Sequence, residues 1–493
     1  MKIYHRWIAA AAALAALQLP LNISAAAQTN TGRITNMTQF YDNWKARYLV
    51  QNTYVTDETQ YYVYYSDEHY SGNGSVAVTV SEAHGYGMLI TASMAAYDPQ
   101  AQELFDGMVR YYQAHPSEIG KHLMAWQQSD NGSALVEEDG ADSASDGDMD
   151  IAYALLLADT VWGSDGAYNY HDMAISVLHD IMEYEVNHNT WTINLGDWAH
   201  WEEEGDQYYG ATRSSDFFLQ YYPVFAEVTG DDNWMKVYDS TNAIIDSVVE
   251  QYGTGLLPDF LIPDENGGYM PAPKNFLEDV TDGQYAYNSC RTPWRIGMDY
   301  LVNKNATAKK CLDAMNTFII NKTGGDPWEI RAGYTLDGTA TQDYDDLCFT
   351  APFLIAAKCG TDTDWENELR DCILEYGDDV YYGDTIKMLC LIADADAWIV
   401  PEKQPDQTET TAETTTETSE ETTTETTAAP QNTLGDINLD GQTTLADIVL
   451  LLQYLLGNET LSQEQTVRAD MQQDGIVNGM DLAVLRQELI NKA

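Results

Sequence analysis

Apolar residues recur at helical spacing along most of the first 400 residues. In the stretch 149–162, Ile151, Leu155 and Ala158 follow a period of about 3.6 residues, with no Gly or Pro. The same periodicity predicts helices over 38–50, 81–96, 101–114, 148–162, 171–188, 214–228, 234–252, 286–302, 306–320, 345–357, 364–376 and 383–393. Residues 28–400 therefore predict one large all-α domain, and six helical hairpins in a ring are one way to bury its apolar faces.

Strand patterning is weak, and 61–65 is the best short candidate for a strand. Gly, Asp, Asn and Tyr are common in the loops between the predicted helices, and many of these loops are longer than helix packing requires. Long loops on a helical scaffold are where binding and catalytic residues concentrate.

Two segments differ in composition from this domain. Lys2 and Arg6 precede an apolar run that ends in Ser24-Ala-Ala-Ala27, which predicts a secretory signal peptide over 1–27. Residues 401–433 are mostly Thr and Glu with nothing apolar to bury, which predicts a disordered, extended linker. We expect an exported protein with no membrane contact after signal cleavage, because no other run is long and apolar enough to span a bilayer.

The net charge and the cysteine spacing exclude some classes of partner and of metal site. The net charge of −54 argues against nucleic acid as a partner, because phosphate neutralisation needs clustered Lys and Arg. The six cysteines all lie within 290–390, at spacings that fit neither a small disulfide scaffold nor a CxxC zinc site. We expect buried free thiols, although disulfides are compatible with an exported protein.

An internal repeat occupies residues 434–493. Each copy places oxygen-bearing residues at the ligand positions of an EF-hand loop, has Gly at position 6 and Asp in place of Glu at position 12, and continues into an amphipathic helix. Two such loops predict two Ca²⁺ ions, with ligands Asp436, Asn438, Asp440, Gln442 and Asp447 in the first loop and Asp470, Gln472, Asp474, Ile476 and Asp481 in the second.

This tail resembles a type I dockerin, a module that plugs enzymes into cohesins on a cellulosome scaffold. Both copies match the loop–helix plan of that family, including Asp at position 12. The resemblance implies a small helical domain whose partner is a cohesin, recognised around Leu445-Ala446 and Gly479-Met480. It also implies an extracellular protein associated with a cellulosome.

Two acidic motifs open predicted helices in the large domain. Ala144-Ser-Asp-Gly-Asp148, followed by Asp150, places three carboxylates around the first turn of one helix. Glu82 lies in Val80-Ser-Glu-Ala-His-Gly-Tyr-Gly-Met88. Helix capping, with Ser81 as N-cap in the second motif, is the simpler interpretation of each. A carboxylate site is the alternative, because one acid is enough to cap a helix.

Both motifs resemble the signatures of glycoside hydrolase family 8, and the resemblance extends over nearly all of the large domain. It implies an (α/α)6 barrel that hydrolyses β-linked polysaccharide with inversion and needs no cofactor for catalysis. By resemblance, Glu82 is the general acid, and Asp146 holds the sugar at the −1 subsite. Asp148 and Asp150 are then expected to be helix caps or supporting groups.

The general base is harder to assign than the acid. Asn288 stands where one subfamily has its catalytic Asp, and Asn cannot accept a proton from water. The chain resembles instead the chitosanase and lichenase-like branch, whose base comes from an upstream loop, here 271–282. We assign the base to Glu278, with Glu265, Asp279 and Asp282 as alternatives. A solvated loop acid is the other interpretation of Glu278. Asn288 is expected to orient water or sugar, and Arg291 and Arg295 to pair with the carboxylates.

Other candidate residues surround these acids. Arg213 and Asp216 form either a structural ion pair or part of the cleft. Candidate stacking platforms for sugar rings are the aromatic residues Trp126, Trp198, Trp201, Tyr334 and Tyr344.

The predicted function is an inverting endo-β-glucanase that acts on β-1,4- or mixed-linkage β-1,3-1,4-glucan. Chitosanase or xylanase activity of the same family is the alternative, and an acidic protein would attract cationic chitosan. An inactive, dockerin-borne carbohydrate-binding or scaffold protein is the alternative of another class. It is supported only by Asn288, while the Glu82 and Asp146 motifs are intact.

Overall fold

The computed structural model divides the chain into two compact units, residues 1–406 and 407–493. In the first unit it describes residues 25–401 except 67–68, 71–74, 138–139, 200–206 and 378–379. In the second it describes residues 434–439, 443, 447–448, 450–451, 454, 461–471, 477, 481–482 and 484–485. Apart from 25–27 and 401, the predicted signal peptide and linker therefore lie outside the described residues.

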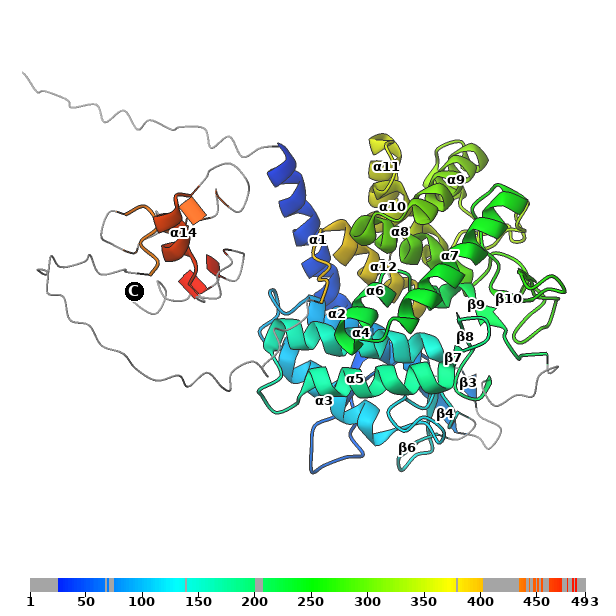
Figure 1. Cartoon of the computed structure of the whole chain (residues 1–493), viewed down its shortest axis with the longest axis horizontal. Helices are drawn as coiled ribbons and strands as arrows, with labels where there is room; N and C mark the ends of the chain where they lie inside the picture. Colours follow the sequence, from blue (N-terminus) through cyan, green and yellow to red (C-terminus); the bar gives the residue numbers. More distant parts are fainter. Residues whose placement is uncertain are drawn as a thin grey trace, which may run out of the picture. The chain divides into compact units, whose positions relative to one another are not determined.

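Twelve α-helices follow one another through the described part of the first unit, each overlapping a range that apolar periodicity predicts (Figure 1). They are α1 (Ala25–Tyr48), α2 (Ser81–Ser93), α3 (Ala101–Ala114), α4 (Ser145–Trp162), α5 (Tyr170–Asp180), α6 (Tyr222–Thr229), α7 (Asn233–Tyr252), α8 (Thr292–Asn303), α9 (Ala306–Thr323), α10 (Leu347–Lys358), α11 (Thr363–Glu375) and α12 (Tyr381–Asp394).

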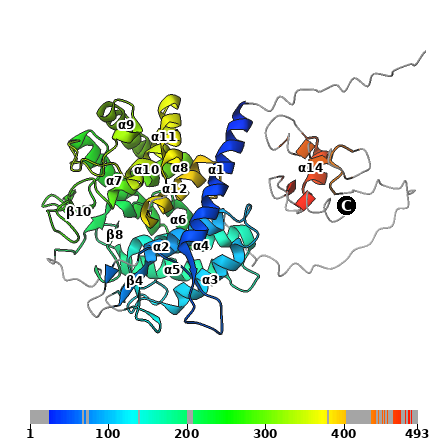
Figure 2. The same ribbon diagram turned by 180° about the vertical axis from the view of Figure 1, so that it is seen from behind.

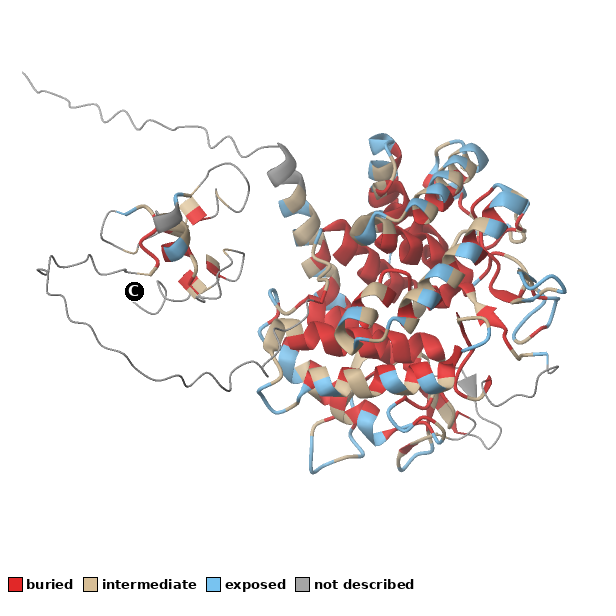
Figure 3. Cartoon of the chain, in the orientation of Figure 1, coloured by how far each residue is buried: buried red, intermediate tan, exposed pale blue. Residues whose placement is uncertain are grey.

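Buried and half-buried helices alternate along the chain. Helices α2, α4, α8, α10 and α12 bury residues around most of their circumference, whereas α3, α7, α9 and α11 bury one face and expose the other (Figure 3). A helix that is apolar on all sides belongs inside a large domain, and an amphipathic helix belongs at its surface. The sequence pattern therefore sorts the helices into an inner and an outer layer.

The inner helices form a closed ring. Helix α2 packs against α4 and α12, α12 packs against α10, and α10 packs against α8. The 3-10 turn η3 (Ser214–Asp216) contacts both α4 and α8 and completes the circle. Outer helices cover the ring through the pairs α2–α3, α4–α5, α6–α7, α8–α9 and α10–α11, while α1 lies beside α12 in both views (Figures 1 and 2). This is the (α/α)6 barrel that the family resemblance implies.

The helix expected over 214–228 is wrong in its first half. Residues 214–216 form η3, and the α-helix α6 begins only at Tyr222. Pro223 explains this start, because proline lacks an N–H and fits the first turn of a helix but not its interior. The helix expected over 171–188 also ends early, in the π-turn η1 (Ile181–Glu185).

Short antiparallel strands lie in the loops at one end of the barrel, and of these only β2 (Tyr61–Val63) was expected. The largest sheet has the order β3 (His69–Tyr70), β4 (Val76–Val80), β5 (Gln127–Asp130) and β6 (Leu135–Val136), and a second sheet has the order β11 (Tyr269–Pro271), β10 (Phe260–Pro263) and β9 (Thr212–Arg213). Two-stranded sheets join β1 (Leu49–Gln51) to β2 and β7 (Val186–Asn187) to β8 (Thr192–Ile193). Strands this short give too few residues for alternation to show in the sequence.

The second unit contains helical segments among its described residues, joined by turns. Helix α14 (Gln463–Ala469) begins with a capping box between Ser462 and Gln465. Residues 447–448, 450–451, 454, 481–482 and 484–485 are also helical, in agreement with the helices expected after each calcium loop. The core of this unit contains Ile437, Leu451, Ala469, Met471 and Leu485. Among the described residues of both units, no helix combines the length and the apolar character needed to cross a bilayer.

Candidate active site

Helices α2 and α4 meet at two glycines that belong to the acidic motifs. A Cβ on Gly85 would lie 2.8 Å from Asp150 Cβ, and a Cβ on Gly147 would lie 2.6 Å from the backbone carbon of Ser81. Real Cβ atoms do not approach other atoms so closely, so each position requires glycine. This close contact brings the first turns of the two helices together, and with them Glu82 and Asp146.

Arg291 connects the two acids. Its Nη1 donates to Glu82 Oε2 over 2.6 Å and to Asp146 Oδ2 over 3.1 Å. The guanidinium is 1% exposed, and it also donates to the hydroxyl of Tyr86 and to Oδ1 of Asn288, both over 3.0 Å. Arg291 pairs with both carboxylates, as expected. Arg295, by contrast, pairs with Asp150, with Nη2 2.5 Å from Oδ2.

The surroundings of Glu82 and Asp146 shift the pKa values of these two acids in opposite directions. Burial, reinforced by the charges of Asp146 and Asp150, raises the pKa of Glu82 to about 7, although Arg291 and Arg213 oppose the shift. Burial also acts to raise the pKa of Asp146, but Arg213 and Arg291 outweigh it and hold that pKa below its usual value. Glu82 can therefore carry a proton near neutral pH, while Asp146 remains ionised.

Glu278 lies on the loop that follows β11, and two residues hold it there. Its Oε2 accepts a hydrogen bond from Asn288 Nδ2 over 2.8 Å. Its backbone N–H donates to Asp282, whose buried carboxylate also accepts the N–H groups of Leu277 and Asp279, over 2.8 to 3.0 Å. Asp282 therefore folds the loop, and Asn288 directs the carboxylate of Glu278.

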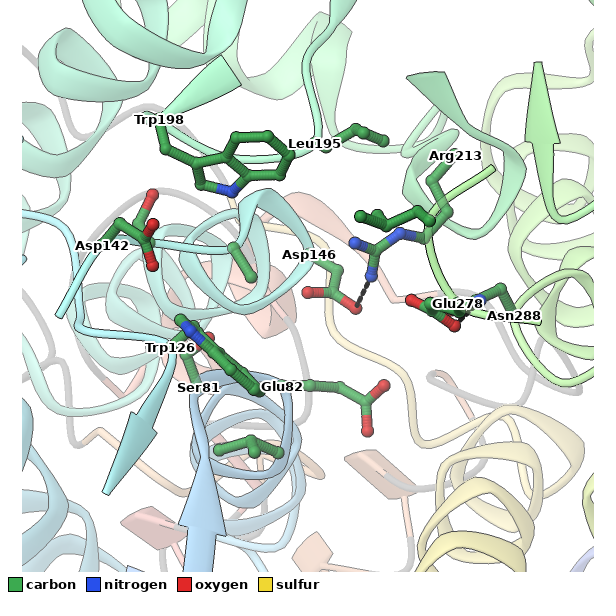
Figure 4. A pocket seen from close by; sticks show the side chains of 14 residues that line it. Ser81, Glu82, Trp126, Asp142, Asp146, Leu195, Trp198, Arg213, Glu278 and Asn288 are labelled. Carbon is green, nitrogen blue, oxygen red and sulfur yellow. Dashed lines mark hydrogen bonds and ion pairs between the residues drawn. The ribbon is translucent and has the colours of Figure 1, made fainter. Parts of the chain in front are cut away.

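One cavity of about 460 Å³ collects these groups (Figure 4). Glu82, Asp146 and Glu278 point into it from three different segments, and their carboxylates lie at the corners of a triangle in this view (Figure 4). Trp126 and Trp198 are also in its wall. The full lining is Val80, Ser81, Glu82, Trp126, Asp142, Ser143, Ala144, Asp146, Leu195, Trp198, Arg213, Leu277, Glu278 and Asn288.

Ser81 is not the N-cap of α2, and in the first turn of α4 Asp146 accepts the N–H of Gly147 over 3.0 Å while Asp148 and Asp150 make other contacts. The N-caps of α2 and α4 are Val80 and Ala144, and neither side chain makes a capping hydrogen bond. Asp148 accepts the N–H of Met124 instead, and Asp150 pairs with Arg295 and accepts the hydroxyl proton of Tyr221. The free N–H groups at the start of a helix need acceptors, and a neighbouring segment can supply them, as the carbonyl of Trp126 does for the N–H of Ser81.

Arg213 fits both expected interpretations, because it pairs with Asp216 and lines the cavity, whereas Asp216 fits only the ion pair. Arg213 lines the cavity and lies 3.5 Å from Asp146 Oδ2, and its Nε lies 3.8 Å from Asp216 Oδ2. Burial raises the pKa of Asp216 to about 6, against the opposing effect of Arg213.

The expected aromatic residues divide into three groups. Trp126 and Trp198 line the cavity, while Trp201 lies outside the described residues. Tyr334 is wrong as a sugar-stacking residue, because it is fully buried and its ring packs against Phe318 and Tyr285. Tyr344 is 45% exposed but is not among the residues that line the cavity.

Several site residues were not anticipated from the sequence. The hydroxyl of Tyr381 lies 3.5 Å from Glu82 Oε1, and the ring of Tyr382 lies 5.9 Å from the guanidinium carbon of Arg291. Asp259 accepts the backbone N–H and the hydroxyl of Ser289 over 2.7 and 2.6 Å, which fixes the turn next to Asn288. Burial raises the pKa of Asp259 to about 7. Tyrosines are so numerous in this chain that no sequence signal separates these from the rest.

In the second unit, three of the described acids of the two loops are buried, and Asp470 is half-buried. Asp436, Asp447 and Asp481 are each at most 2% exposed, which is unusual for acids in solvated turns. Asp447 Oδ1 accepts the N–H groups of Ile437 and Asn438, and Arg468 donates to Asp436 Oδ2 over 2.7 Å. Carboxylate oxygens are the ligands that a calcium ion takes, but no group of three or more metal-binding side chains comes together among the described residues of these loops. Asp470 is described too, whereas Asp440, Gln442, Gln472, Asp474 and Ile476 lie outside the described residues.

Comparison with known families agrees with the description of the large domain and with that of the second unit. Residues 13–396 match the model of glycosyl hydrolases family 8, which is well over half of the chain. The chain belongs to glycosyl hydrolase family 8. Residues 434–490 match the type I dockerin domain. The protein is therefore a family 8 glycoside hydrolase that carries a type I dockerin, a module class that binds calcium and cohesins.

Individual relatives show how far the similarity extends. A beta-glucanase from Niallia circulans is 43% identical over 361 residues, which is 73% of this chain and 83% of that protein. Endoglucanase A of Acetivibrio thermocellus is 29% identical over 396 residues, 78% of this chain and 73% of that protein. The apo structure of a β-1,3-1,4-glucanase from Paenibacillus sp. X4 superposes with a TM-score of 0.69 at 42% identity, covering 75% of this chain and 94% of that one.

Proposed function

We propose that this family 8 enzyme is an inverting endo-β-glucanase that hydrolyses β-1,4- or mixed-linkage β-1,3-1,4-glucan. Support for the substrate comes from the relatives with 43% and 42% identity, a beta-glucanase and a β-1,3-1,4-glucanase. Trp126 and Trp198 in the cavity wall offer flat apolar faces of the kind that sugar rings stack on.

The observation that carries the mechanism is that Glu82 and Glu278 enter one cavity from separate segments, and that Asp146 lines the same cavity. In an inverting hydrolase one carboxyl donates a proton to the leaving oxygen, and the other takes a proton from water on the opposite side of the sugar ring. A raised pKa suits Glu82 to the first role. The hydrogen bond from Asn288 keeps Glu278 directed for the second role.

The reaction then proceeds in one displacement. Glu82 transfers its proton to the glycosidic oxygen as the bond from that oxygen to C1 breaks. A water molecule attacks C1 from the other face and gives its proton to Glu278, so the new reducing end has the inverted configuration. Asp146, ionised between Arg213 and Arg291, accepts hydrogen bonds from the sugar in the −1 subsite. The roles predict that the two catalytic carboxyls are about 6.5–9.5 Å apart.

The dockerin completes the proposal. Residues 434–493 bind two calcium ions, one in each loop, and attach the enzyme to a cohesin of a cellulosome scaffold outside the cell. The ten loop residues predicted from the sequence are the proposed ligands. At positions 1 and 12 of the loops, Asp436, Asp447 and Asp481 are buried and Asp470 is half-buried. The signal peptide over 1–27 directs the export.

The test is reducing-end release by the full chain on barley β-glucan, carboxymethylcellulose, xylan and chitosan, beside the Glu82→Gln variant. We expect the two glucans to be cut by the wild type only, and proton NMR of early products to show the α-anomer. Preferred cleavage of xylan or chitosan would replace the proposed substrate. Absence of cleavage on all four polymers would favour a binding or scaffold protein.

A further inference from the structure

Two buried carboxyl groups lie under the floor of the cavity, next to the segment that carries Asp146. Asp148 lies in the first turn of α4, and Glu185 ends the π-turn η1. Both residues are fully buried. Among the described residues, no Lys, Arg or His forms an ion pair or a hydrogen bond with either carboxyl, in contrast to Asp146 and Asp150 nearby.

The available donors leave one oxygen of each carboxyl without a partner. Asp148 Oδ1 accepts the N–H of Met124 over 2.8 Å, and Glu185 Oε1 accepts the single hydroxyl proton of Ser143 over 2.6 Å. Asp148 Oδ2 and Glu185 Oε2 meet no N–H or O–H donor of the described residues. Helix α4 packs against η1, and each carboxyl interacts with the other across this contact. Two ionised carboxylates cannot hydrogen-bond, so one of them must supply a proton.

We propose that Asp148 and Glu185 share one proton, and that this pair positions the cavity segment 143–146. The pair joins α4 to η1, and the Ser143 hydroxyl ties the segment to Glu185. Ser145 continues the attachment by donating to the carbonyl of Asn194 over 2.8 Å. Asp148 and Glu185 are thus positioning residues that act on Asp146 through the chain between them.

The groups around the pair agree with a protonated state. Asp197, on the loop after β8, already accepts three donors, from Ser117, Gly120 and Ser143, and is therefore a satisfied anion close to the pair. Tyr112 on α3 faces Asp148, and its pKa is raised by burial. Burial raises the pKa of both Asp148 and Glu185 well above the usual range, and neighbouring carboxylates add to the shift.

The shared proton predicts a specific dependence of stability on pH. Unfolded Asp and Glu lose their protons near pH 4, whereas the folded pair keeps one proton at higher pH. The folded state then binds one more proton than the unfolded state, so this pair makes the folding equilibrium constant fall about tenfold for each pH unit above about pH 5. This dependence ends where the folded pair itself loses the proton.

The experiment compares the wild type with Asp148→Asn, whose amide N–H can replace the shared proton. We expect the variant to fold, and the slope of its unfolding free energy against pH between about pH 5 and 7 to be smaller by one proton than that of the wild type, in which Glu82, Asp216 and Asp259 also contribute. The wild-type-minus-variant infrared difference spectrum at neutral pH should contain the band of one protonated carboxylic acid, whereas the contributions of Glu82 and Asp259 are common to both proteins and cancel. Asp159→Asn, a buried change on the same helix, is the matched control and should keep both signals. Asp148→Ala, which breaks the pair, should lower kcat on β-glucan by displacing segment 143–146.

An unchanged unfolding slope and an unchanged infrared band in Asp148→Asn would overturn the proposal. If that variant does not fold, Glu185→Gln makes the same test from the other side of the pair. Only the activity readout rests on the proposed function. If the wild type cuts no glucan, the proton linkage and the infrared band still decide whether the proton is shared.

Discussion

Arg291 Nη1 lies 2.6 Å from Glu82 Oε2, so the carboxyl that we propose as proton donor is paired with a permanent cation. The cation favours the ionised form of Glu82, yet burial and the nearby Asp146 still raise its pKa to about 7. The protonation of the proposed acid is therefore a balance between burial, which favours the proton, and Arg291, which opposes it.

This balance predicts how activity depends on pH. Glu82 must be protonated to act, so kcat/KM on β-glucan should fall as the pH rises through about 7. In Arg291→Met the opposing cation is gone, and the descending limb should move to higher pH even though the maximal rate is lower. Arg331→Met, which removes an arginine that pairs with Glu329 outside the cavity lining, should leave the limb unchanged. A limb that moves to lower pH in Arg291→Met would contradict the argument.

The assignment of the base predicts a contrast among the acids of one region. Glu278→Gln should lower kcat by about 10²- to 10⁴-fold, because the attacking water then has no proton acceptor. Glu265→Gln and Asp279→Asn change exposed acids that do not line the cavity, and both variants should keep wild-type rates. Initial rates on β-glucan make the comparison. Activity lost in Glu265→Gln and kept in Glu278→Gln would move the base to the β10–β11 turn.

Asp282 should act through Glu278 rather than in its place. Its carboxylate accepts three backbone N–H groups of the loop, and the amide in Asp282→Asn would set an N–H against one of these donors. We expect kcat to fall by up to about 10²-fold through misplacement of Glu278, with KM nearly unchanged. Asp264→Asn is the matched control, because Asp264 caps the exposed β10–β11 turn in the same way through Asn266 and Gly268. Equal loss in both variants would show that the effect is not specific to the Glu278 loop.

The sequence predicts the helices well because each one is long enough to show its period. Existence and type of all twelve are confirmed, and the main error is at Pro223, where a short helix begins later than the apolar pattern suggests. The positions of Glu82 and Asp146 in the first turns of two helices were also expected. The N-cap expected at Ser81 was wrong, because local sequence cannot show that a neighbouring segment supplies the hydrogen bond.

Contacts between segments that are distant in the sequence could not be predicted from the sequence. Nothing local distinguishes Asp282 as a loop cap from Asp279 as a solvated acid, yet one is 1% exposed and the other is exposed. Tyr334 lies in a matching segment, but its burial depends on Phe318 and Tyr285 from other elements. Asp148 and Glu185 are 37 residues apart by their numbering, and only the fold brings them together.

Close contact of α2 and α4 gives a prediction for Gly147. The Cβ added by Gly147→Ala would overlap the side chain and the backbone of Ser81, so the two helices must separate. Overpacking of this kind destabilises by about 1–3 kcal/mol, and kcat should fall because Glu82 and Asp146 move apart. Gly166→Ala adds a methyl group where nothing lies within 4 Å, and it should be neutral in both assays. Thermal unfolding and initial rates on β-glucan test both effects, and a fully active, stable Gly147→Ala variant would contradict the close contact.

Removal of calcium should separate the two activities of the chain. Buried carboxylates such as Asp447 and Asp481 need a cation or donors in the folded dockerin, so a chelator should unfold this unit and abolish cohesin binding. Hydrolysis of soluble β-glucan should be unchanged, because the acids proposed for catalysis pair with Arg213, Arg291 and Asn288. Asp447→Ala should reproduce the loss of cohesin binding without a chelator, and calorimetric titration should give two Ca²⁺ ions in the wild type and one in the variant. Equal loss of hydrolysis on chelation would place a required metal in the catalytic unit instead.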